Sequence, residues 1–157
     1  MQSQFFLNAQ GAIRLVQLKT QNSKLSSPLM DILQILKDDY QHFPVDQTYS
    51  IYAEDVYFKD PTSEFRGVDR YKRTIAFIQA WFHHCKMDLH KIQQTGNTIR
   101  TDWTLSWQTP LPWHPRITIP GWSELTLSAD GLIVSHLDYW HCSRLDVLKQ
   151  HFLPKTR

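Results

Sequence analysis

The sequence predicts an α+β protein, with helices in its first half and a meander of antiparallel strands in its second half. From residue 29 to residue 82, apolar residues recur mainly at every third or fourth position, which is the spacing of an amphipathic helix. From residue 87 to residue 142 the period is two, as in strands with one buried face. Helical spacing returns only after Ser143. The order of these two periods defines the fold class.

The helical segments carry recognisable start and stop signals. We expect helices over residues 28–43, 68–82 and 144–152. Ser26-Ser27-Pro28 favours a helix start, because serine caps and proline is tolerated in the first turn, and Pro44 ends the same helix. Ser143 caps the closing helix in the same way. Asp46 predicts a further short helix through Tyr49 and Tyr52.

The strands are bounded by turn residues. We expect strands over residues 56–60, 87–94, 99–108, 117–127 and 132–142, with a turn over residues 61–67. Thr95-Gly96-Asn97 and Asp130-Gly131 are hairpin signals. Pro120-Gly121 predicts a bend inside the fourth of these strands.

Composition excludes several classes of protein. The chain has 157 residues, is 41% hydrophobic and 20% charged, and so is neither disordered nor collagen-like. No apolar run approaches the roughly 18 residues that cross a membrane, and the near-neutral charge of +2 offers no footprint for nucleic acid. We expect residues 1–28 to be a poorly ordered extension and 29–157 a single domain. Cys85 and Cys142 are expected to be reduced thiols, which favours the cytoplasm.

Two short motifs resemble one superfamily. The segment 52–61 (YAEDVYFKDP), followed by Gly67 and a helix, resembles the signature of SnoaL-like, ketosteroid isomerase-like proteins, which share the nuclear transport factor 2 fold. Residues 129–133 (ADGLI) and 138–140 (DYW) resemble its last hairpin. The resemblance spans about residues 30–150 in element order. It implies a cone-shaped, curved mixed or antiparallel sheet packed on three helices around a pocket open at one end.

A closer resemblance carries no activity with it. Residues 121–125 (GWSEL) and 138–144 (DYWHCSR) resemble an uncharacterised cyanobacterial and plant-plastid family of the same superfamily. It implies a cytoplasmic location, or a plastid one if the chain comes from a plant. Fold transfers readily within such a superfamily, and function does not.

Catalytic roles carry over only in part. In ketosteroid isomerase the aspartate of the first motif is the base that moves a proton next to a carbonyl group, and Asp60 occupies its place. Its second catalytic acid falls on Ser123. Its helix tyrosine falls on Leu36, with Tyr40 one turn away. One of three roles is therefore present, and the isomerase reaction itself is not expected.

Strand parity predicts the lining of the pocket. If Asp60 and Trp140 face inward, alternate residues on the same strands face inward too. This parity places Ile133, Leu137 and Tyr139 on the outer face and Leu132 and Val134 on the inner one. The ligand-binding candidates are Tyr40, Phe58, Trp103, Trp107, Ser123 and Trp140. The catalytic candidates are Asp60, His136 and Asp138. An aromatic interior with few polar groups is typical of a small-molecule pocket.

The polar candidates have structural readings beside the functional ones. Asp60 could cap the turn before the long helix, while His136 and Asp138 could form a satisfied internal network or act as acid and base. We expect no metal, because adjacent His83 and His84 cannot easily chelate one ion and no spaced ligand pair occurs. No phosphate-binding glycine loop occurs either, and we expect no cofactor.

Three functions follow from this pattern. The first is binding of a small, largely apolar ligand in the pocket. The second is proton transfer by an isomerase, cyclase or dehydratase that uses Asp60 or the His136/Asp138 pair. The third is a protein-interaction scaffold that uses the outer sheet face. Apolar residues on that face also predict a homodimer, unless the closing helix or the N-terminal extension covers them.

Overall fold

The structure, a computed structural model, describes residues 27–152. Its helices are α2 (Ser27–His42), the 3-10 turn η1 (Tyr49–Ile51), α3 (Val68–Trp81) and α4 (Arg144–Gln150). Its strands are β1 (Tyr52–Lys59), β2 (Glu64–Arg66), β3 (His83–Thr95), β4 (Thr98–Gln108), β5 (Arg116–Leu127) and β6 (Ile133–Trp140). The packing described below lies within Gln34–Arg157, the larger of two units into which the chain divides. The predicted extension falls almost wholly outside the described range and stays a prediction.

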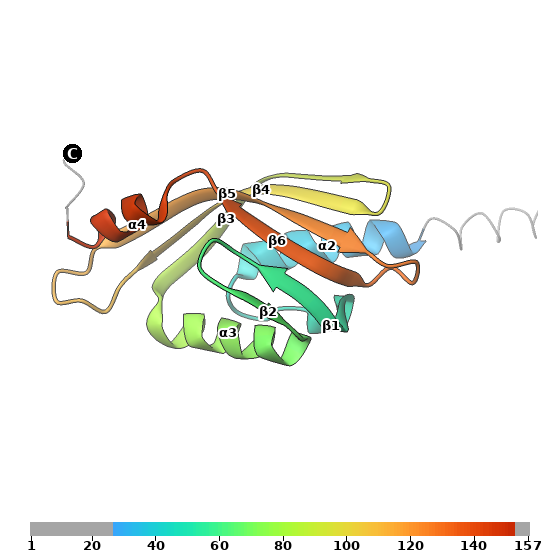
Figure 1. Cartoon of the computed structure of the whole chain (residues 1–157), viewed down its shortest axis with the longest axis horizontal. Helices are drawn as coiled ribbons and strands as arrows, with labels where there is room; N and C mark the ends of the chain where they lie inside the picture. The colour runs from blue at the N-terminus through green and yellow to red at the C-terminus, as the bar shows by residue number, and fades with distance from the viewer. Residues whose placement is uncertain (1–26, 153–157) are drawn as a thin grey trace, which may run out of the picture. The chain divides into compact units, whose positions relative to one another are not determined.

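The strands form one mixed sheet. Their order is β2-β1-β6-β5-β4-β3, and the pairing of β1 with β6 is parallel while the other pairings are antiparallel. In the view of Figure 1, α3 lies below this curved, unclosed sheet and α4 lies above it beside β5. Helices followed by a meander confirm the α+β class predicted from the sequence.

The inner face of β4 and β5 forms the core. Alternate residues on these strands are buried, namely Ile99, Thr101, Trp103, Trp107, Ile117, Ile119, Ser123, Leu125 and Leu127. The register between β4 and β5 runs without a shift from Thr98↔Thr126 to Gln108↔Arg116. Pro120-Gly121 therefore introduces no bulge, and the predicted inward parity of β5 is confirmed.

Gly121 is required by close packing rather than by its backbone angle. A Cβ at this position would lie 2.5 Å from the Tyr139 carbonyl oxygen and 2.6 Å from Cη2 of Trp103. The indole of Trp103 therefore packs closely against β5 at a place where only glycine leaves room. This fixes the inward position of the ring.

The parity predicted for the start of β6 is wrong. The pairing of β5 with β6 shifts between Thr126 and Leu127, so that Leu127 pairs with Ile133 while Thr126 pairs with Ser135. The extra residue reverses the alternation. Ile133 is fully buried, although parity placed it outside, and Leu132 is exposed. His136 and Asp138, which lie beyond the shift, keep the predicted orientation toward the cavity.

Three local predictions also need correction. The short helix through Tyr49 and Tyr52 is only the 3-10 turn η1, because β1 already begins at Tyr52 and pairs with β6. Asp46 does not cap it, since the residue before η1 is Thr48 and Asp46 itself has a φ of 54°. The turn over residues 61–67 contains β2, which pairs with β1.

The helix ends follow the sequence signals. α2 ends two residues before Pro44, and α3 begins directly after Gly67. At α4, Ser143 Oγ accepts a hydrogen bond from the Asp146 N–H at 3.1 Å, and the Asp146 carboxylate accepts one from the Ser143 N–H at 3.0 Å. This reciprocal capping box stabilises a helix of only seven residues. Between residues 27 and 152, no helix has the length and apolar character needed to cross a bilayer.

Candidate functional site

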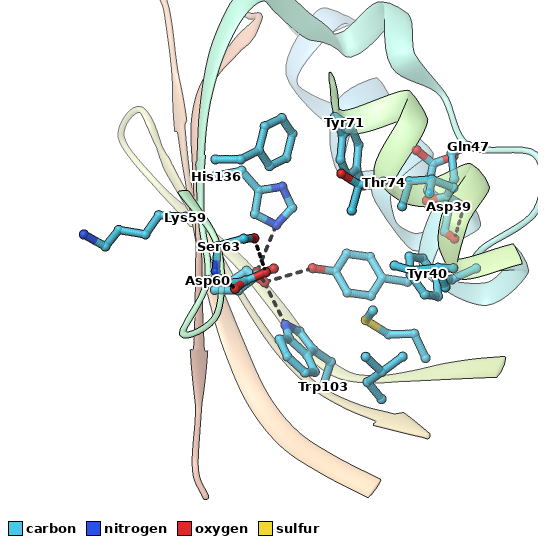
Figure 2. Close-up of a pocket in the computed structure, with 18 of the residues that line it drawn as sticks. Asp39, Tyr40, Gln47, Lys59, Asp60, Ser63, Tyr71, Thr74, Trp103 and His136 are labelled. Atoms are coloured by element: carbon cyan, nitrogen blue, oxygen red, sulfur yellow. Dashed lines mark hydrogen bonds and ion pairs between the residues drawn. The ribbon is translucent and has the colours of Figure 1, made fainter. Parts of the chain in front are cut away.

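A cavity lies between the inner sheet face and the helices α2 and α3 (Figure 2). Its volume is about 150 Å³, which is the size of a cavity that holds one benzene-sized molecule. Most of its wall is apolar or aromatic. The lining comprises Leu36, Asp39, Tyr40, Phe43, Gln47, Tyr52, Phe58, Lys59, Asp60, Ser63, Phe65, Tyr71, Thr74, Ile75, Ile78, Met87, Trp103, Leu105, Ser123, His136, Asp138 and Trp140.

A polar network centred on Ser123 forms one side of the cavity. The Trp103 indole N–H donates to Ser123 Oγ at 2.7 Å, and Ser123 Oγ donates to Asp138 Oδ1 at 2.5 Å. Figure 2 shows the phenol of Tyr40, from α2, directed toward the same group. Ser123 thus joins β4, β5, β6 and α2 at one point.

The hydrogen-bond donors of this network have acceptors within the protein. The one proton of the Ser123 hydroxyl goes to Asp138, because a carboxylate oxygen only accepts. The Tyr40 hydroxyl lies 2.8 Å from Thr101 Oγ1 and 3.4 Å from Ser123 Oγ, and its proton is available to either of them. Trp103, Ser123 and Tyr40 therefore all have partners within the protein.

His136 reaches Asp138 from the same strand. Its Nε2 lies 3.0 Å from Asp138 Oδ1, and because that oxygen accepts, Nε2 carries the proton. In the neutral ring Nδ1 is then an acceptor, and the Tyr52 hydroxyl lies 3.5 Å from it. The two-residue spacing that placed His136 and Asp138 on one face is thus realised as a direct contact.

Burial sets the ionisation of the tyrosines. Burial raises the pKa of Tyr40 and of Tyr71 above its usual range, and the negative charge of Asp138 raises both further. Burial also raises the pKa of Tyr52. All three side chains are therefore neutral phenols near neutral pH and can donate hydrogen bonds.

The three carboxylates of the wall differ in what they bind. Both oxygens of Asp39 accept from the Thr48 N–H at 3.1 Å, and Oδ1 also accepts from Thr48 Oγ1 at 2.8 Å. Burial raises the pKa of Asp39, an effect that the bonds from Thr48 oppose. At Asp138, Oδ1 accepts from Ser123 and His136, whereas Oδ2 has no partner among the described residues. The Asp138 side chain is 33% exposed and belongs to the cavity lining.

Asp60 acts as a turn residue in the structure. Its Oδ1 accepts from the N–H groups of Thr62 and Ser63, both at 2.6 Å, and from Thr62 Oγ1 at 2.7 Å. Its Oδ2 accepts from Ser63 Oγ at 2.9 Å. These contacts hold the turn between β1 and β2, and Asp60 and Ser63 also belong to the cavity lining. A ligand would have to compete with them for the carboxylate.

An aromatic cluster forms the part of the wall next to His136. Phe58 stacks on Tyr71 with ring centroids 4.2 Å apart and lies 5.2 Å from His136. Tyr52 and Phe65 lie within 5.6 Å and 5.3 Å of Phe58. These rings and His136 form one continuous aromatic part of the cavity wall.

The six predicted ligand-binding residues divide into two groups. Tyr40, Phe58, Trp103, Ser123 and Trp140 line the cavity. Trp107 does not; its ring stacks on Phe82 with centroids 4.5 Å apart, and it fills the core near the end of α3. Strand parity gave its inward direction correctly, but parity carries no information about distance along the strand from the cavity.

Several residues of the site were missed from the sequence. Thr101, which contacts the Tyr40 hydroxyl but does not line the cavity, shares the parity of Ile99 and Trp103, and this signal could have identified it. Asp39 lies three residues after Leu36 on α2, so helical spacing also indicated its inward face. Tyr71 lies within the helix predicted over residues 68–82, but helical spacing does not reveal where its hydroxyl group points.

Metal and thiol chemistry find little support in this region. Within residues 27–152, no group of three or more His, Cys, Asp or Glu side chains is close enough to hold a metal ion. Cys85 and Cys142 are both free and half-buried. Burial raises the pKa of the Cys85 thiol to about 11, so this group is not an activated nucleophile.

The fold is the nuclear transport factor 2-like, ketosteroid isomerase-like α+β cone, as similar solved structures show. A hypothetical protein with a ketosteroid isomerase-like fold from Catenulispora acidiphila, in complex with trimethylamine, is 17% identical over 78% of this chain and 93% of that one, with a TM-score of 0.63. A LEH-like epoxide hydrolase from M. tuberculosis is 17% identical over 79% of this chain and 89% of that one, with a TM-score of 0.61. An NTF2-like protein from Burkholderia thailandensis is 15% identical over 77% of this chain and 96% of that one, with a TM-score of 0.63. At these identities the similarity shows the fold alone.

The chain belongs to the family described as "Uncharacterized conserved protein (DUF2358)". The model of this family matches residues 30–136, which include most of α2 and the sheet as far as His136. No protein among those with curated functions matches the chain in sequence.

Proposed function

We propose that this protein binds a small, largely apolar molecule in the cavity between the sheet and the helices α2 and α3. The observation that carries the proposal is a cavity of about 150 Å³ whose wall is mostly apolar, with a few convergent polar groups. A cavity plugged by Trp103 and Trp140 would have argued for a scaffold, but both rings belong to the wall. The trimethylamine held by the similar protein from Catenulispora acidiphila supports a small-ligand role for this fold.

Toluene is a suitable first probe, because one ring with a methyl group fits the volume and carries no charge. Titrating toluene into the isotope-labelled full chain should shift the methyl resonances of Ile75 and Leu105, which line the cavity. The methyl resonances of Leu137, on the outer face, should not move. Absence of any shift, or shifts confined to the outer face, would contradict the proposal.

A blocking variant checks the same point from the protein side. Leu105→Trp places a larger side chain in the wall and should abolish the toluene shifts at Ile75. Leu137→Trp is the matched control on the neighbouring face and should leave toluene binding intact. Equal binding by both variants would place the toluene outside the cavity.

Proton transfer is a second candidate, favoured by the Asp138 carboxylate oxygen that has no partner among the described residues. Such an oxygen can take a proton from a carbon next to a carbonyl group and return it. Deuterium exchange at this carbon of cyclohexanone in D₂O measures the reaction by proton NMR. Wild type should accelerate exchange and Asp138→Asn should not.

The other predicted base gives a control for this experiment. Asp60 is held by Thr62 and Ser63, so Asp60→Asn should keep most of the acceleration. Loss of exchange in Asp60→Asn with retention in Asp138→Asn would instead assign the base to Asp60. No acceleration by wild type would count against this candidate.

The remaining expectations are proposals of the same kind. We propose a homodimer through the outer sheet face, where Trp122 stacks on Tyr139 and the latter is 40% exposed. Sedimentation of wild type and Tyr139→Ala tests it, and a wild-type monomer at micromolar concentration would count against it. The same face is the surface a protein-interaction scaffold would use. Relation to the cyanobacterial and plastid family, and a cytoplasmic or plastid location, rest on the sequence resemblance.

A further inference from the structure

We infer that the cavity selects a small organic cation, in which an amine or ammonium group is carried on a compact apolar body, with Asp138 as its counter-ion. This inference deepens the proposed function and rests on it. It concerns the polarity of the ligand, which the volume and apolar wall leave open.

The first observation is the state of the acidic side chains. Asp39, Asp60 and Asp138 line the cavity, and the oxygens of Asp39 and Asp60 accept bonds from neighbouring turns. In the part of the chain that the structure describes, Asp138 Oδ2 is the carboxylate oxygen of this wall without a partner. A carboxylate oxygen accepts hydrogen bonds and cannot donate them. A ligand that carries a donor at this point therefore fits Asp138 Oδ2.

The second observation concerns positive charge. Lys59 is the one lysine or arginine in the described lining, and its ammonium group lies 3.0 Å from Glu64 Oε2. Figure 2 shows its side chain extending away from the cavity. No lysine or arginine of the described wall is therefore directed at Asp138. An anionic ligand would meet the Asp138 carboxylate, whose nearest basic neighbour is His136 at 3.0 Å, with no lysine or arginine of the described wall to balance a second negative charge.

The third observation is the direction of the neutral donors. Trp103, Ser123 and His136 all direct their protons toward Ser123 or Asp138 rather than into the cavity. Tyr40 likewise has partners in Thr101 and Ser123. A pocket built for a carbonyl or another oxygen anion needs donors that converge on the ligand. Here Ser123 and His136 donate to Asp138, and Trp103 donates to Ser123, which holds the Asp138 carboxylate in place for a cation.

The test uses three probes of one shape on the full-length chain at neutral pH: benzylammonium, toluene and benzoate. We expect benzylammonium to bind about 10- to 100-fold more tightly than toluene, the range of a charge-assisted hydrogen bond. Benzoate should bind more weakly than toluene. Equal or tighter binding of toluene or benzoate would overturn the inference and leave the proposed function intact. Failure of all three probes to bind would overturn both.

Two variants, each of which removes one negative charge, test whether Asp138 causes the preference for benzylammonium over toluene. Asp138→Asn should remove the preference for benzylammonium over toluene, while toluene still binds and so reports an intact cavity. Asp102→Asn removes one negative charge from the outer side of β4, where Asp102 contacts Arg100, and should keep the preference. A preference that survives Asp138→Asn, or disappears equally in Asp102→Asn, would overturn the assignment.

A measurement on wild type keeps the inference testable if Asp138→Asn does not fold. Nuclear Overhauser contacts of bound benzylammonium should place its methylene group beside Trp103 and Trp140 and its ring beside Ile75. The reverse orientation, with the methylene group away from Asp138, would overturn the inference.

Discussion

On β4, β5 and β6, the two faces of the sheet each carry a cluster of interacting side chains, and the two clusters differ in the kind of contact they make. On the inner face Trp103, Ser123 and Asp138 form a chain of hydrogen bonds, which we call the inner network. On the outer face Arg100 lies 3.9 Å from the ring centroid of Trp122, and Trp122 stacks on Tyr139 at 4.1 Å; we call these residues the outer stack. Ser123↔Asp138 and Trp122↔Tyr139 are adjacent pairs of one register.

The difference between the faces is one of desolvation. Trp103 and Ser123 are buried, so removing one partner leaves the other without water as a substitute. Tyr139 is 40% exposed and the Arg100 side chain 50% exposed, so water replaces much of what a substitution removes. Inner-network substitutions should therefore cost more free energy of unfolding than outer-stack substitutions.

The largest effect is expected for Gly121→Ala. The new Cβ would overlap the Tyr139 carbonyl oxygen and the Trp103 ring, so the backbone or the indole must move. Overpacking of a core typically lowers the free energy of unfolding by about 1–3 kcal/mol, and a backbone neighbour places this site at about 3 kcal/mol. Urea unfolding of the purified variant measures it.

Gly96→Ala separates packing from backbone conformation in this measurement. Gly96 has a φ of +60°, and no atom lies within 4 Å of the position that an alanine Cβ would take, so alanine there costs only about 1 kcal/mol. A Gly121→Ala effect no larger than that of Gly96→Ala would mean that Trp103 moves aside easily. The inner network would then resist displacement of Trp103 less than its short hydrogen bonds indicate.

Ser123→Ala should come next. It removes the acceptor of the Trp103 N–H and one donor to Asp138, and an unsatisfied buried group costs about 1–3 kcal/mol. Ser135→Ala on β6 is a matched control, because the Ser135 hydroxyl has no side-chain hydrogen bond among the described residues. We expect a control effect within about 0.5 kcal/mol. Equal losses from the two substitutions, measured by urea unfolding, would show that the inner network adds no stability.

Arg100→Ala tests the other side of the comparison. It removes the contact with Trp122 and the ion pair with Asp102 at 3.3 Å, both on an exposed side chain. We expect a loss of about 0.5–1 kcal/mol in the free energy of unfolding. A loss as large as that of Ser123→Ala would break the distinction between the faces, and would indicate that the outer stack is covered in solution.

The success of the sequence analysis depended on the regularity of each strand. Parity predicted the inner faces of β4 and β5, because their register has no shift, and it failed at Ile133, where one extra residue in β6 reverses the alternation. Bulges depend on how strands meet, so the sequence of one strand does not reveal them. The pairing of His136 with Asp138 was accessible because both lie on one face of one strand.

Other site features depend on contacts that no local pattern encodes. The motif drew attention to Asp60, but whether its oxygens are free depends on Thr62 and Ser63 folding back onto them. Trp107 and Trp103 have the same parity, yet only Trp103 reaches the cavity, because α3 ends at Trp81 and Phe82 then stacks on Trp107. Distance from the cavity is a tertiary property of the inner face.

The smallest effect concerns a charge on the inner side. Burial raises the pKa of Asp39 above its ordinary value of 3.8, outweighing the bonds from Thr48, while Asp38 raises it and His42 lowers it to lesser extents. The folded state therefore binds a proton more tightly than the unfolded state, and wild type loses stability as the pH rises from 3.8 through the raised pKa. Asp39→Asn keeps an acceptor for Thr48 without this titration, so the variant should gain stability relative to wild type across that window and stay level above it. Urea unfolding at a series of pH values measures the difference. If wild type instead gained free energy of unfolding relative to Asp39→Asn as the pH rose, the hydrogen bonds from Thr48 would outweigh burial. The desolvation that distinguishes the inner face from the outer face would then not decide the ionisation of Asp39.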